Sequence, residues 1–225
     1  MAPSPFPDIK LKKDLTLNEV LPSQIYTIDD FLTTAELKAV LKWTENVRME
    51  EPKPPGKGEA ERTAKRGSIE STEIASTISK LLIPYVPKLL PKYGRDLKDL
   101  LLSPNIRVYH YPKDSFFDCH YDSPTLDLNS KRLSCWTILI YLTNVDKGGN
   151  TIFYTNTHDP TPSKSKKSST KSKSKGGAEQ VISVEPKSGR LLLHWHGLKN
   201  GGCLKHEGEK VEKGDKWVFR TDILA

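Results

Sequence analysis

The first part of the chain carries apolar residues at the spacing of amphipathic helices. Residues 33–47 place them three and four positions apart behind Thr34, the expected N-cap. Residues 71–82 repeat the pattern behind Ser71, and residues 94–102 have the composition of a short third helix. The pattern therefore predicts a helical portion that occupies residues 1–103.

After Pro104 the pattern changes to short alternating stretches bounded by Gly, Pro or Lys/Ser. The stretch SCWTILIYLT is the clearest: Trp136, Ile138 and Ile140 share one face, and Thr137 and Tyr141 share the other. Helices followed by some eight short strands predict an α+β fold that is mainly β: a double-stranded β-helix (jelly roll) with N-terminal supporting helices.

The boundaries between these portions predict a single domain over residues 1–225, with the jelly-roll core at 104–225. The Lys/Ser-rich tract at about 160–178 interrupts that core. It contains no apolar side chain large enough to contribute to a core, so we expect a disordered loop between two strands.

Charge adds one qualification to this picture. The formal net charge is +7, but the tract alone holds six lysines and no acid, which leaves 7 − 6 = +1 for the remaining residues. A nucleic-acid partner is therefore expected only through the Lys-rich loop, which could equally serve nuclear targeting or be inert.

The first residues show no apolar run, and the three cysteines have no paired spacing. We therefore expect no membrane association and a reducing compartment, cytoplasmic and/or nuclear.

Candidate chemistry begins at FFDCHYDSP, residues 116–124, where His120 and Asp122 lie one residue apart and share a face of an extended segment. Buried and unpaired, two such groups would cost several kcal/mol. A strand-end ion pair would compensate them, and so would a metal. The third ligand with the best context is His206, which precedes a Gly-containing turn and a strand that starts at Lys216; His194 and His196 are rivals.

Four segments together resemble the prolyl 4-hydroxylase branch of the 2-oxoglutarate/Fe(II)-dependent oxygenases. They are YHYPKDSFFDCHYD, TILIYLTNVDKGGNTIF, VEPKSGRLLLHW and HEGEKVEKGDKWV, in that order. The resemblance covers about residues 104–222; the first hundred residues match only in being helical. It departs from the family at Asn150, where many relatives have Glu, and at Asp222, where some have Trp.

The resemblance implies an Fe(II) site made by His120, Asp122 and His206. It also implies that the distal carboxylate of 2-oxoglutarate is bound by Lys216, with hydroxyl groups donated by Thr137 and Tyr111. Arg220 shares the Lys216 face of the last strand, so its side chain points into the pocket or forms a surface ion pair.

The implied activity is a dioxygenase that uses Fe(II), 2-oxoglutarate and O₂, with ascorbate as an accessory reductant, to hydroxylate a C–H bond. The expected substrate is an intracellular protein or peptide, with a prolyl residue preferred. A nucleic-acid oxygenase or demethylase and a non-catalytic jelly-roll binding module are the alternatives. The substrate's identity and the oligomeric state stay open.

Overall fold

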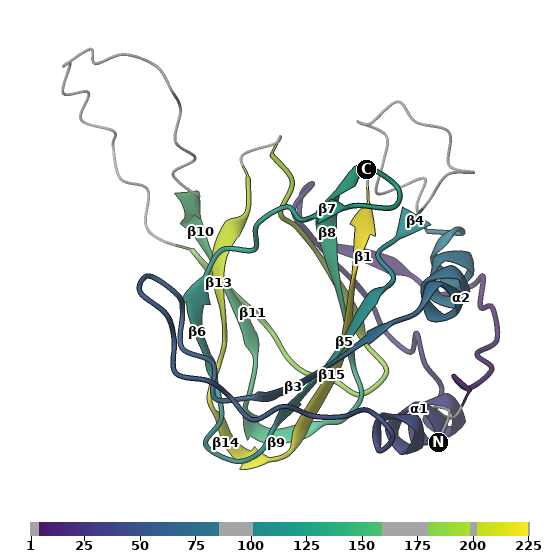
Figure 1. Ribbon diagram of the computed structural model, residues 1–225, viewed down its shortest axis with the longest axis horizontal. Coiled ribbons are helices and arrows are strands. Elements are labelled where there is room, and N and C mark those ends of the chain that lie inside the picture. The colour runs from purple at the N-terminus through teal and green to yellow at the C-terminus, as the bar shows by residue number, and fades with distance from the viewer. Residues whose placement is uncertain (1–4, 86–100, 159–179, 199–201, 225) are drawn as a thin grey trace.

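The computed structural model describes residues 5–85, 101–158, 180–198 and 202–224. Two antiparallel sheets face each other, and two helices lie outside the larger sheet (Figure 1). Within the described residues the structure is mainly β, so the predicted jelly roll with supporting helices is confirmed. The expected Lys/Ser loop falls outside the described residues.

The larger sheet runs in the order β1-β2-β12-β8-β15-β5-β3, while β4 pairs with β15 and β7 pairs with β8. Every strand pair in it is antiparallel. Its strands are β1 (Leu17–Leu21), β2 (Ile25–Ile28), β3 (Lys65–Glu70), β4 (Leu101–Leu102), β5 (Asn105–Tyr111), β7 (Leu126–Asp127), β8 (Arg132–Tyr141), β12 (Leu191–Trp195) and β15 (Lys216–Leu224).

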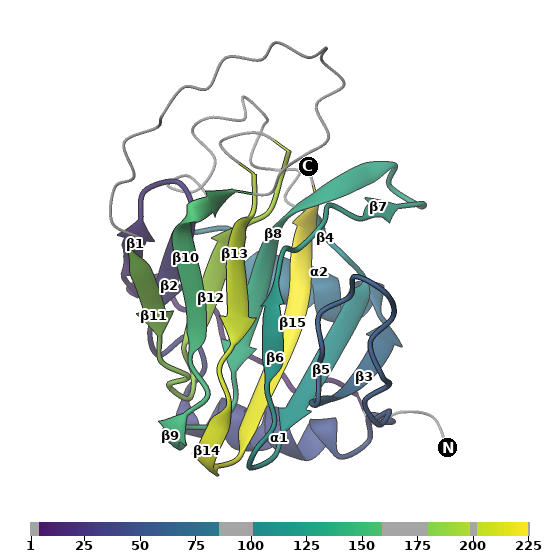
Figure 2. The same ribbon diagram turned by 90° about the vertical axis from the view of Figure 1, so that its left-hand side faces the viewer.

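The smaller sheet runs in the order β11-β10-β13-β6, and β14 pairs with β9 below it (Figure 2). Its position opposite β8 and β15 leaves an interior between the sheets, where side chains from both can meet. The strands are β6 (Phe117–His120), β10 (Thr151–His158), β11 (Val181–Val184) and β13 (Leu204–Gly208), with β9 (Val145–Gly148) and β14 (Val211–Gly214).

Helices α1 (Thr34–Thr44) and α2 (Thr72–Leu82) start at side-chain caps. Ser71 caps α2 as expected, but the cap of α1 is Thr33, one residue before the expected Thr34. Thr33 accepts from the backbone N–H of Glu36 and Glu36 accepts from that of Thr33, a reciprocal arrangement that satisfies two free helix N–H groups.

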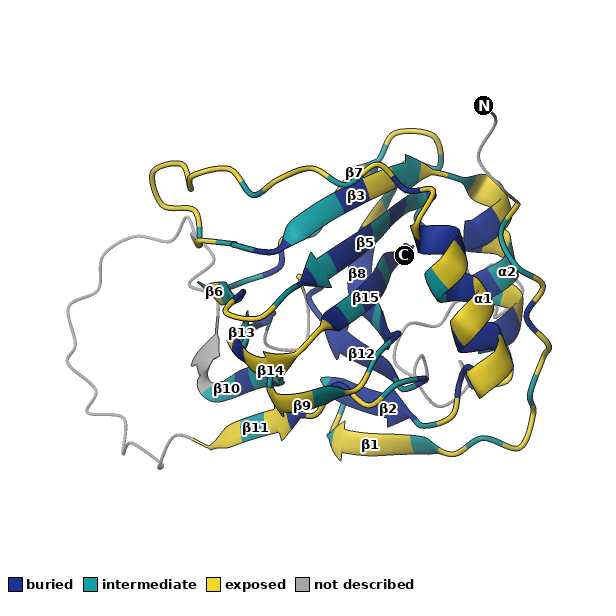
Figure 3. Ribbon diagram, turned by 90° about the horizontal axis from the view of Figure 1, so that it is seen from below, coloured by how far each residue is buried: buried dark blue, intermediate teal, exposed yellow. Residues whose placement is uncertain are grey.

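The two faces of the larger sheet have different tasks. Trp136, Ile138 and Ile140 of β8 pack in the hydrophobic cluster that includes the helices. Leu139 and Tyr141 pack in the second cluster, between the sheets. Figure 3 shows the buried strands and the inner helix surfaces that result. The alternation read from the sequence is therefore the alternation between helix-facing and interior positions.

The first portion, expected to be helical over residues 1–103, contains the helices α1 and α2 but also three strands. Strands β1, β2 and β3 all lie before residue 103 and extend the larger sheet at its two edges. The third helix expected over 94–102 falls mostly outside the described residues, and its last two positions form β4. Edge strands with mixed exposure, such as β1, show no clean alternation, which is why the pattern did not reveal them.

None of the described helices combines the length and apolar character needed to cross a bilayer.

The α1 cap generates a prediction about acid stability. Burial opposes ionisation of Glu36, but Lys12 and the N–H groups of Thr33 and Lys10 outweigh it and lower its pKa to about 2. The resulting stabilisation is present above the unfolded pKa and is lost as pH falls toward 2. We expect Glu36→Gln to lower the free energy of unfolding at neutral pH by about 1–3 kcal/mol, and by much less near pH 2.

Urea titration of both proteins at several pH values measures this difference. Glu45→Gln, at the exposed opposite end of the same helix, is the matched control and should show little change at any pH. If the free energy of unfolding of Glu36→Gln stayed below that of the wild type by the same amount across the acid range, the charge-based explanation would be contradicted.

Candidate metal centre and anion pocket

A group of titratable side chains meets where the smaller sheet faces the larger one. His120 ends β6 and His206 lies on β13, and the two residues are cross-strand partners. Asp122 follows β6 by two residues, so it lies beyond the strand end rather than on the strand. The ligand atoms of His120, Asp122 and His206 all lie within 4.8 Å of one another. The structure thus brings the three expected ligands together.

Both histidines are oriented by backbone carbonyls. Nδ1 of His120 bonds the carbonyl of Asp118 at 2.7 Å, and Nδ1 of His206 bonds that of Leu204 at 2.9 Å. In the neutral ring each bond puts the proton on Nδ1 and leaves the lone pair on Nε2. The Nε2 atoms lie 3.8 Å and 3.9 Å from the Asp122 carboxylate. A divalent cation between them would meet two nitrogen lone pairs and one carboxylate.

The two oxygens of Asp122 have different surroundings. Oδ2 accepts from Thr137 Oγ1 at 2.7 Å and from Arg220 Nη2 at 2.9 Å. Oδ1 is the oxygen nearest His120, whereas Oδ2 is the oxygen nearest His206. With Oδ2 engaged twice, the carboxylate can offer Oδ1 to a metal as a single ligand, which leaves coordination positions for other molecules. This arrangement fits the two-histidine, one-carboxylate facial site of Fe(II) oxygenases.

The protonation states of the group suit a cation. Burial opposes ionisation of Asp122, but Arg220 and the three nearby histidines outweigh it, so its pKa lies well below the ordinary value. Burial, helped by the charge of His206, lowers the pKa of His120 to about 4. Burial also lowers the pKa of His206. Near neutral pH the site therefore holds an ionised carboxylate and two neutral imidazoles, the forms that bind metals.

His194 and His196, the rival histidines, occupy different places. His196 Nδ1 lies 3.0 Å from Thr137 Oγ1 and its Nε2 lies 2.9 Å from Ser134 Oγ, so both ring nitrogens already have hydrogen-bond partners. His194 is closer to the centre: its Nε2 lies 3.5 Å from Asp122 Oδ2, and it forms a second potential ligand group with Cys203 and His206. His206 belongs to both groups, so the geometry leaves His120 and His194 as competitors.

Lys216 is the first residue of β15. It is buried and donates to the Gly149 carbonyl at 2.5 Å. Its cross-strand partner is Tyr111, whose ring centroid lies 5.0 Å from Lys216 Nζ. Burial lowers the pKa of Lys216 to about 7. A buried lysine that shares no ion pair in the described part of the chain is suited to receive an anion.

A small cavity of about 40 Å³ connects Lys216 to the metal group. Its walls include both members of the Lys216–Tyr111 pair and both histidines of the expected triad. They also include Arg220, whose side chain therefore points inward and pairs with Asp122 rather than with a surface group.

The position of Thr137 corrects the role expected from the resemblance. Thr137 is the cross-strand partner of Asp222, six positions along β15 from Lys216, or about 20 Å at the usual rise of a strand. Its hydroxyl instead donates to Asp122. The threonine that lines the cavity with Lys216 is Thr151, buried and 2.7 Å from the Tyr141 hydroxyl. Thr151 directly follows Asn150 in the segment GGNT, residues 148–151, where the sequence departs from the family. That departure was the feature of the sequence that could have drawn attention to Thr151.

Asp222, the second departure from the family, has a defined role. Its side chain is buried and pairs with Arg107 at 3.3 Å and with Arg220 at 3.5 Å. The result is a chain of alternating charges that runs from Arg107 through Asp222 and Arg220 to Asp122. The sequence indicates no role for Arg107. For Arg220 it shows only that the residue shares a strand face with Lys216.

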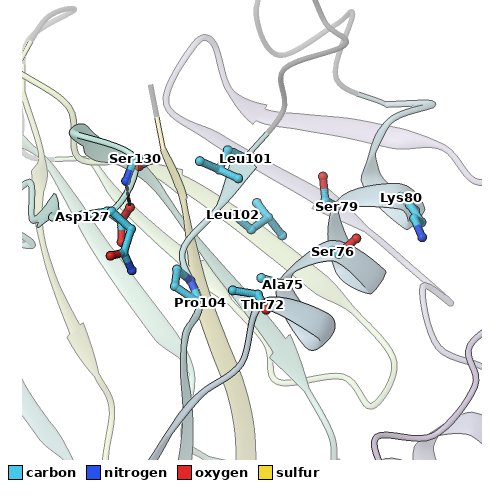
Figure 4. A pocket seen from close by; sticks show the side chains of 11 residues that line it. Thr72, Ala75, Ser76, Ser79, Lys80, Leu101, Leu102, Pro104, Asp127 and Ser130 are labelled. Atoms are coloured by element: carbon cyan, nitrogen blue, oxygen red, sulfur yellow. Dashed lines mark hydrogen bonds between the residues drawn. The ribbon is translucent and has the colours of Figure 1, made fainter.

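A larger hollow of about 300 Å³ lies outside the space between the two sheets, between α2 and β4 (Figure 4). Its lining includes Ala75, Leu102 and Pro104, and its charged members are Lys80 and Asp127. Asp127 accepts from the backbone N–H of Ser130 at 2.6 Å. Among the described residues, no histidine or cysteine lines this hollow.

Comparisons with known proteins agree with this geometry. Residues 106–221 match the family model of the 2OG-Fe(II) oxygenase superfamily. A probable prolyl 4-hydroxylase 6 of Arabidopsis thaliana is 34% identical over 120 residues, an alignment that covers 50% of this chain and 38% of that protein. The chain thus spans well under half the length of that curated relative.

Solved structures share the fold at low sequence identity. A viral collagen prolyl hydroxylase from Paramecium Bursaria Chlorella virus-1, solved as a 2OG complex, has a TM-score of 0.60 at 18% identity and covers 90% of this chain and 96% of its own. A prolyl hydroxylase from Trichoplax adhaerens, solved with a hypoxia inducible factor peptide, has a TM-score of 0.54 at 17% identity and covers 92% and 86%.

The family match covers more than half of the chain, and the histidines, the carboxylate and the buried lysine all fall within it. This chain belongs to the 2OG-Fe(II) oxygenase superfamily.

Proposed function

We propose that this protein is an Fe(II)- and 2-oxoglutarate-dependent dioxygenase that hydroxylates a prolyl residue of an intracellular protein. One observation carries the proposal: the two histidines of an oriented His–Asp–His group line the same cavity as a buried lysine. A binding module that had only kept the fold would have no use for both features together.

His120, Asp122 and His206 would hold the Fe(II). Fe(II) and 2-oxoglutarate bound there would supply the oxidative decarboxylation that activates O₂, and O₂ would be the source of the oxygen atom that the substrate receives. The chain's own contribution is position. The carbonyls of Asp118 and Leu204 fix the imidazoles, and Thr137 and Arg220 occupy Oδ2 so that Asp122 binds through one oxygen.

Lys216 and Tyr111 would bind the distal carboxylate of 2-oxoglutarate, with Thr151 as a further hydroxyl group on the cavity wall. To do so, Lys216 must exchange the Gly149 carbonyl for a carboxylate. A compact ammonium group suits a single carboxylate in an enclosed site, because its three donors can rotate to meet it. The apolar walls around it keep water from competing for the same charge.

The prolyl substrate is proposed from the relatives named above, which are prolyl hydroxylases, one of them solved with a peptide. The intracellular nature of that substrate, the cytoplasmic or nuclear location and any nucleic-acid binding remain predictions from the sequence. The nucleic-acid alternative depends on the Lys-rich loop at 160–178, which lies outside the described residues.

The first test asks which group holds the metal. Under anaerobic conditions, Fe(II) and 2-oxoglutarate together should give the visible charge-transfer band of a chelated complex. We expect His120→Ala to abolish the band and substrate-independent succinate formation, because it removes one of three ligands, whereas His194→Ala and His196→Ala should keep most of both. His206→Ala should abolish them under either assignment.

The informative comparison is therefore His120 against His194. If His194→Ala removes Fe(II) and His120→Ala does not, the metal is held by the group of His194, Cys203 and His206 instead.

A second test uses the lowered pKa of Lys216. An anion that needs the charged ammonium should bind best below pH 7 and progressively worse above it, because the free protein loses that proton as pH rises. We expect the KM for 2-oxoglutarate to rise by about 20-fold between about pH 6.5 and 8.5 at saturating Fe(II). Lys216→Arg, whose charge persists, should flatten the profile even if its KM is higher throughout. An equally steep profile in Lys216→Arg would assign the effect to another group.

A third test distinguishes the roles of the two cations, Arg220 and Lys216, by the binding that each substitution weakens. Arg220→Ala removes a donor from Asp122, so it should weaken Mn(II) or Co(II) binding by roughly 10- to 100-fold in calorimetry. Lys216→Ala should leave metal affinity near that of the wild type and raise the 2-oxoglutarate requirement by roughly 30- to 1000-fold. Arg220→Lys should recover part of the metal affinity. The reverse pattern would make Arg220 the anion partner and Lys216 the support of Asp122.

A further inference from the structure

A second hollow leads to the metal group from outside and has a charge of its own. It is a groove of about 760 Å³ between the loop that precedes β3 and the end of β6, here called the entrance groove. His120 and Asp122 form its floor. Figures 2 and 3 show the loop beside β6, with most of its residues exposed. A molecule lying in the groove would pass directly over the proposed metal.

The groove's rim is basic. Lys53, Arg62 and Arg66 line it, against one carboxylate outside the metal group, that of Glu59. In the described part of the chain none of these three cations forms an ion pair. By contrast Lys65, whose side chain does not line the groove, pairs with Glu51. The cations of the groove are therefore available to a partner.

Arg62 marks the junction between the entrance groove and the inner cavity. Its guanidinium lies 5.8 Å from the ring centroid of Tyr109 and 5.9 Å from that of Phe117, and both rings line the inner cavity. Contacts with two ring faces hold the group in place without neutralising its charge. An acidic side chain next to the reacting residue would meet it there.

The backbone beside the groove favours a polypeptide as the occupant. β6 is the edge strand of the smaller sheet. Its first half is covered by the loop, through the bond from Thr63 N to the Phe116 carbonyl at 3.1 Å and the bond from Asp118 N to the Glu61 carbonyl at 2.8 Å. In the described residues this pairing stops at Asp118, so the remaining edge faces the groove. An open strand edge can pair with an extended peptide, which a nucleic acid cannot do.

We propose that the entrance groove binds an extended segment of the substrate protein that carries acidic residues beside the target residue. The proposal rests on the proposed function and adds the substrate class. Charge attraction would contribute mostly to recognition and to the rate of encounter, and it would be screened by salt.

The test uses short fluorescent peptides with one central proline, flanked by glutamate, glutamine or lysine, and the full chain loaded anaerobically with Fe(II) and 2-oxoglutarate. Anisotropy titrations should show the glutamate peptide binding at least about tenfold more tightly than the lysine peptide, with the difference shrinking at high salt. Arg66→Gln and Lys53→Gln should each weaken the glutamate peptide by about 3- to 10-fold. Glu59→Gln should strengthen it.

Lys57→Gln is the matched control, because Lys57 belongs to the same exposed loop but does not line the groove. It should bind all three peptides as the wild type does. Equal affinity of the wild type for the glutamate and lysine peptides would overturn the proposal, and so would a single-stranded oligonucleotide that displaces the glutamate peptide more effectively than unlabelled peptide does.

The charge-transfer band and peptide-free succinate formation of the wild type report separately on the proposed function. With both present, indifference to peptide charge overturns only the groove's specificity. With both absent, the oxygenase itself is overturned.

Discussion

The carboxylate of Asp122 is the constraint on which the candidate site depends. A buried carboxylate without partners would be costly or protonated. Here its charge is balanced by Arg220, whose own charge is shared with Asp222, which in turn meets Arg107. Two positive and two negative groups alternate, so the interior carries the carboxylate that a cation needs without a large net charge. Removing any one member would leave a neighbour uncompensated, and for buried charges that loss typically exceeds the worth of the pair itself.

Two cations lie at separate positions of β15, one beside the metal group and one at the start of the strand. On β15, Lys216 lies at the end that pairs with Tyr111, and Arg220 lies four residues further on, next to the metal group. Arg220 pairs with Asp122 and Asp222, whereas Lys216 forms no ion pair in the described residues, so the two cations have separate surroundings on one strand. The cavity between is lined by side chains from both sheets. The spacing along β15 would therefore set the distance that a co-substrate spans between Lys216 and the metal, and the proposed peptide would approach the same metal group through the entrance groove.

Much of the fold and of the candidate site could be predicted from the sequence. The features that could not be predicted all depend on how distant segments pair. Alternation placed Ile138 and Tyr141 on opposite faces of one strand, and the structure shows that the first face packs with the helices and the second faces the interior. The ligand set could be proposed because the HxD pair, the distant histidine and the lysine lie in segments that resemble a known family in order and separation. The role of Thr137 could not be predicted correctly. Alternation fixes the face on which a residue lies, but it does not fix which residue of the neighbouring strand lies opposite. That register placed Thr137 opposite Asp222 and left Thr151 beside Lys216. The buried Arg107–Asp222 pair joins positions more than a hundred residues apart, and no local pattern reveals it.

The alternation in β8 and β15 also has an evolutionary consequence. In the middle of β8 and β15, Ile140 and Phe219 belong to the helix-facing cluster, whereas their neighbours Leu139 and Arg220 line the cavity. Substitutions that tune stability and substitutions that tune chemistry thus occupy separate, interleaved sets of codons. Hydrophobic residues can drift on one set without disturbing the other. An insertion or deletion of a single residue would exchange the two sets at once, so these strands should tolerate replacement far better than a change of length.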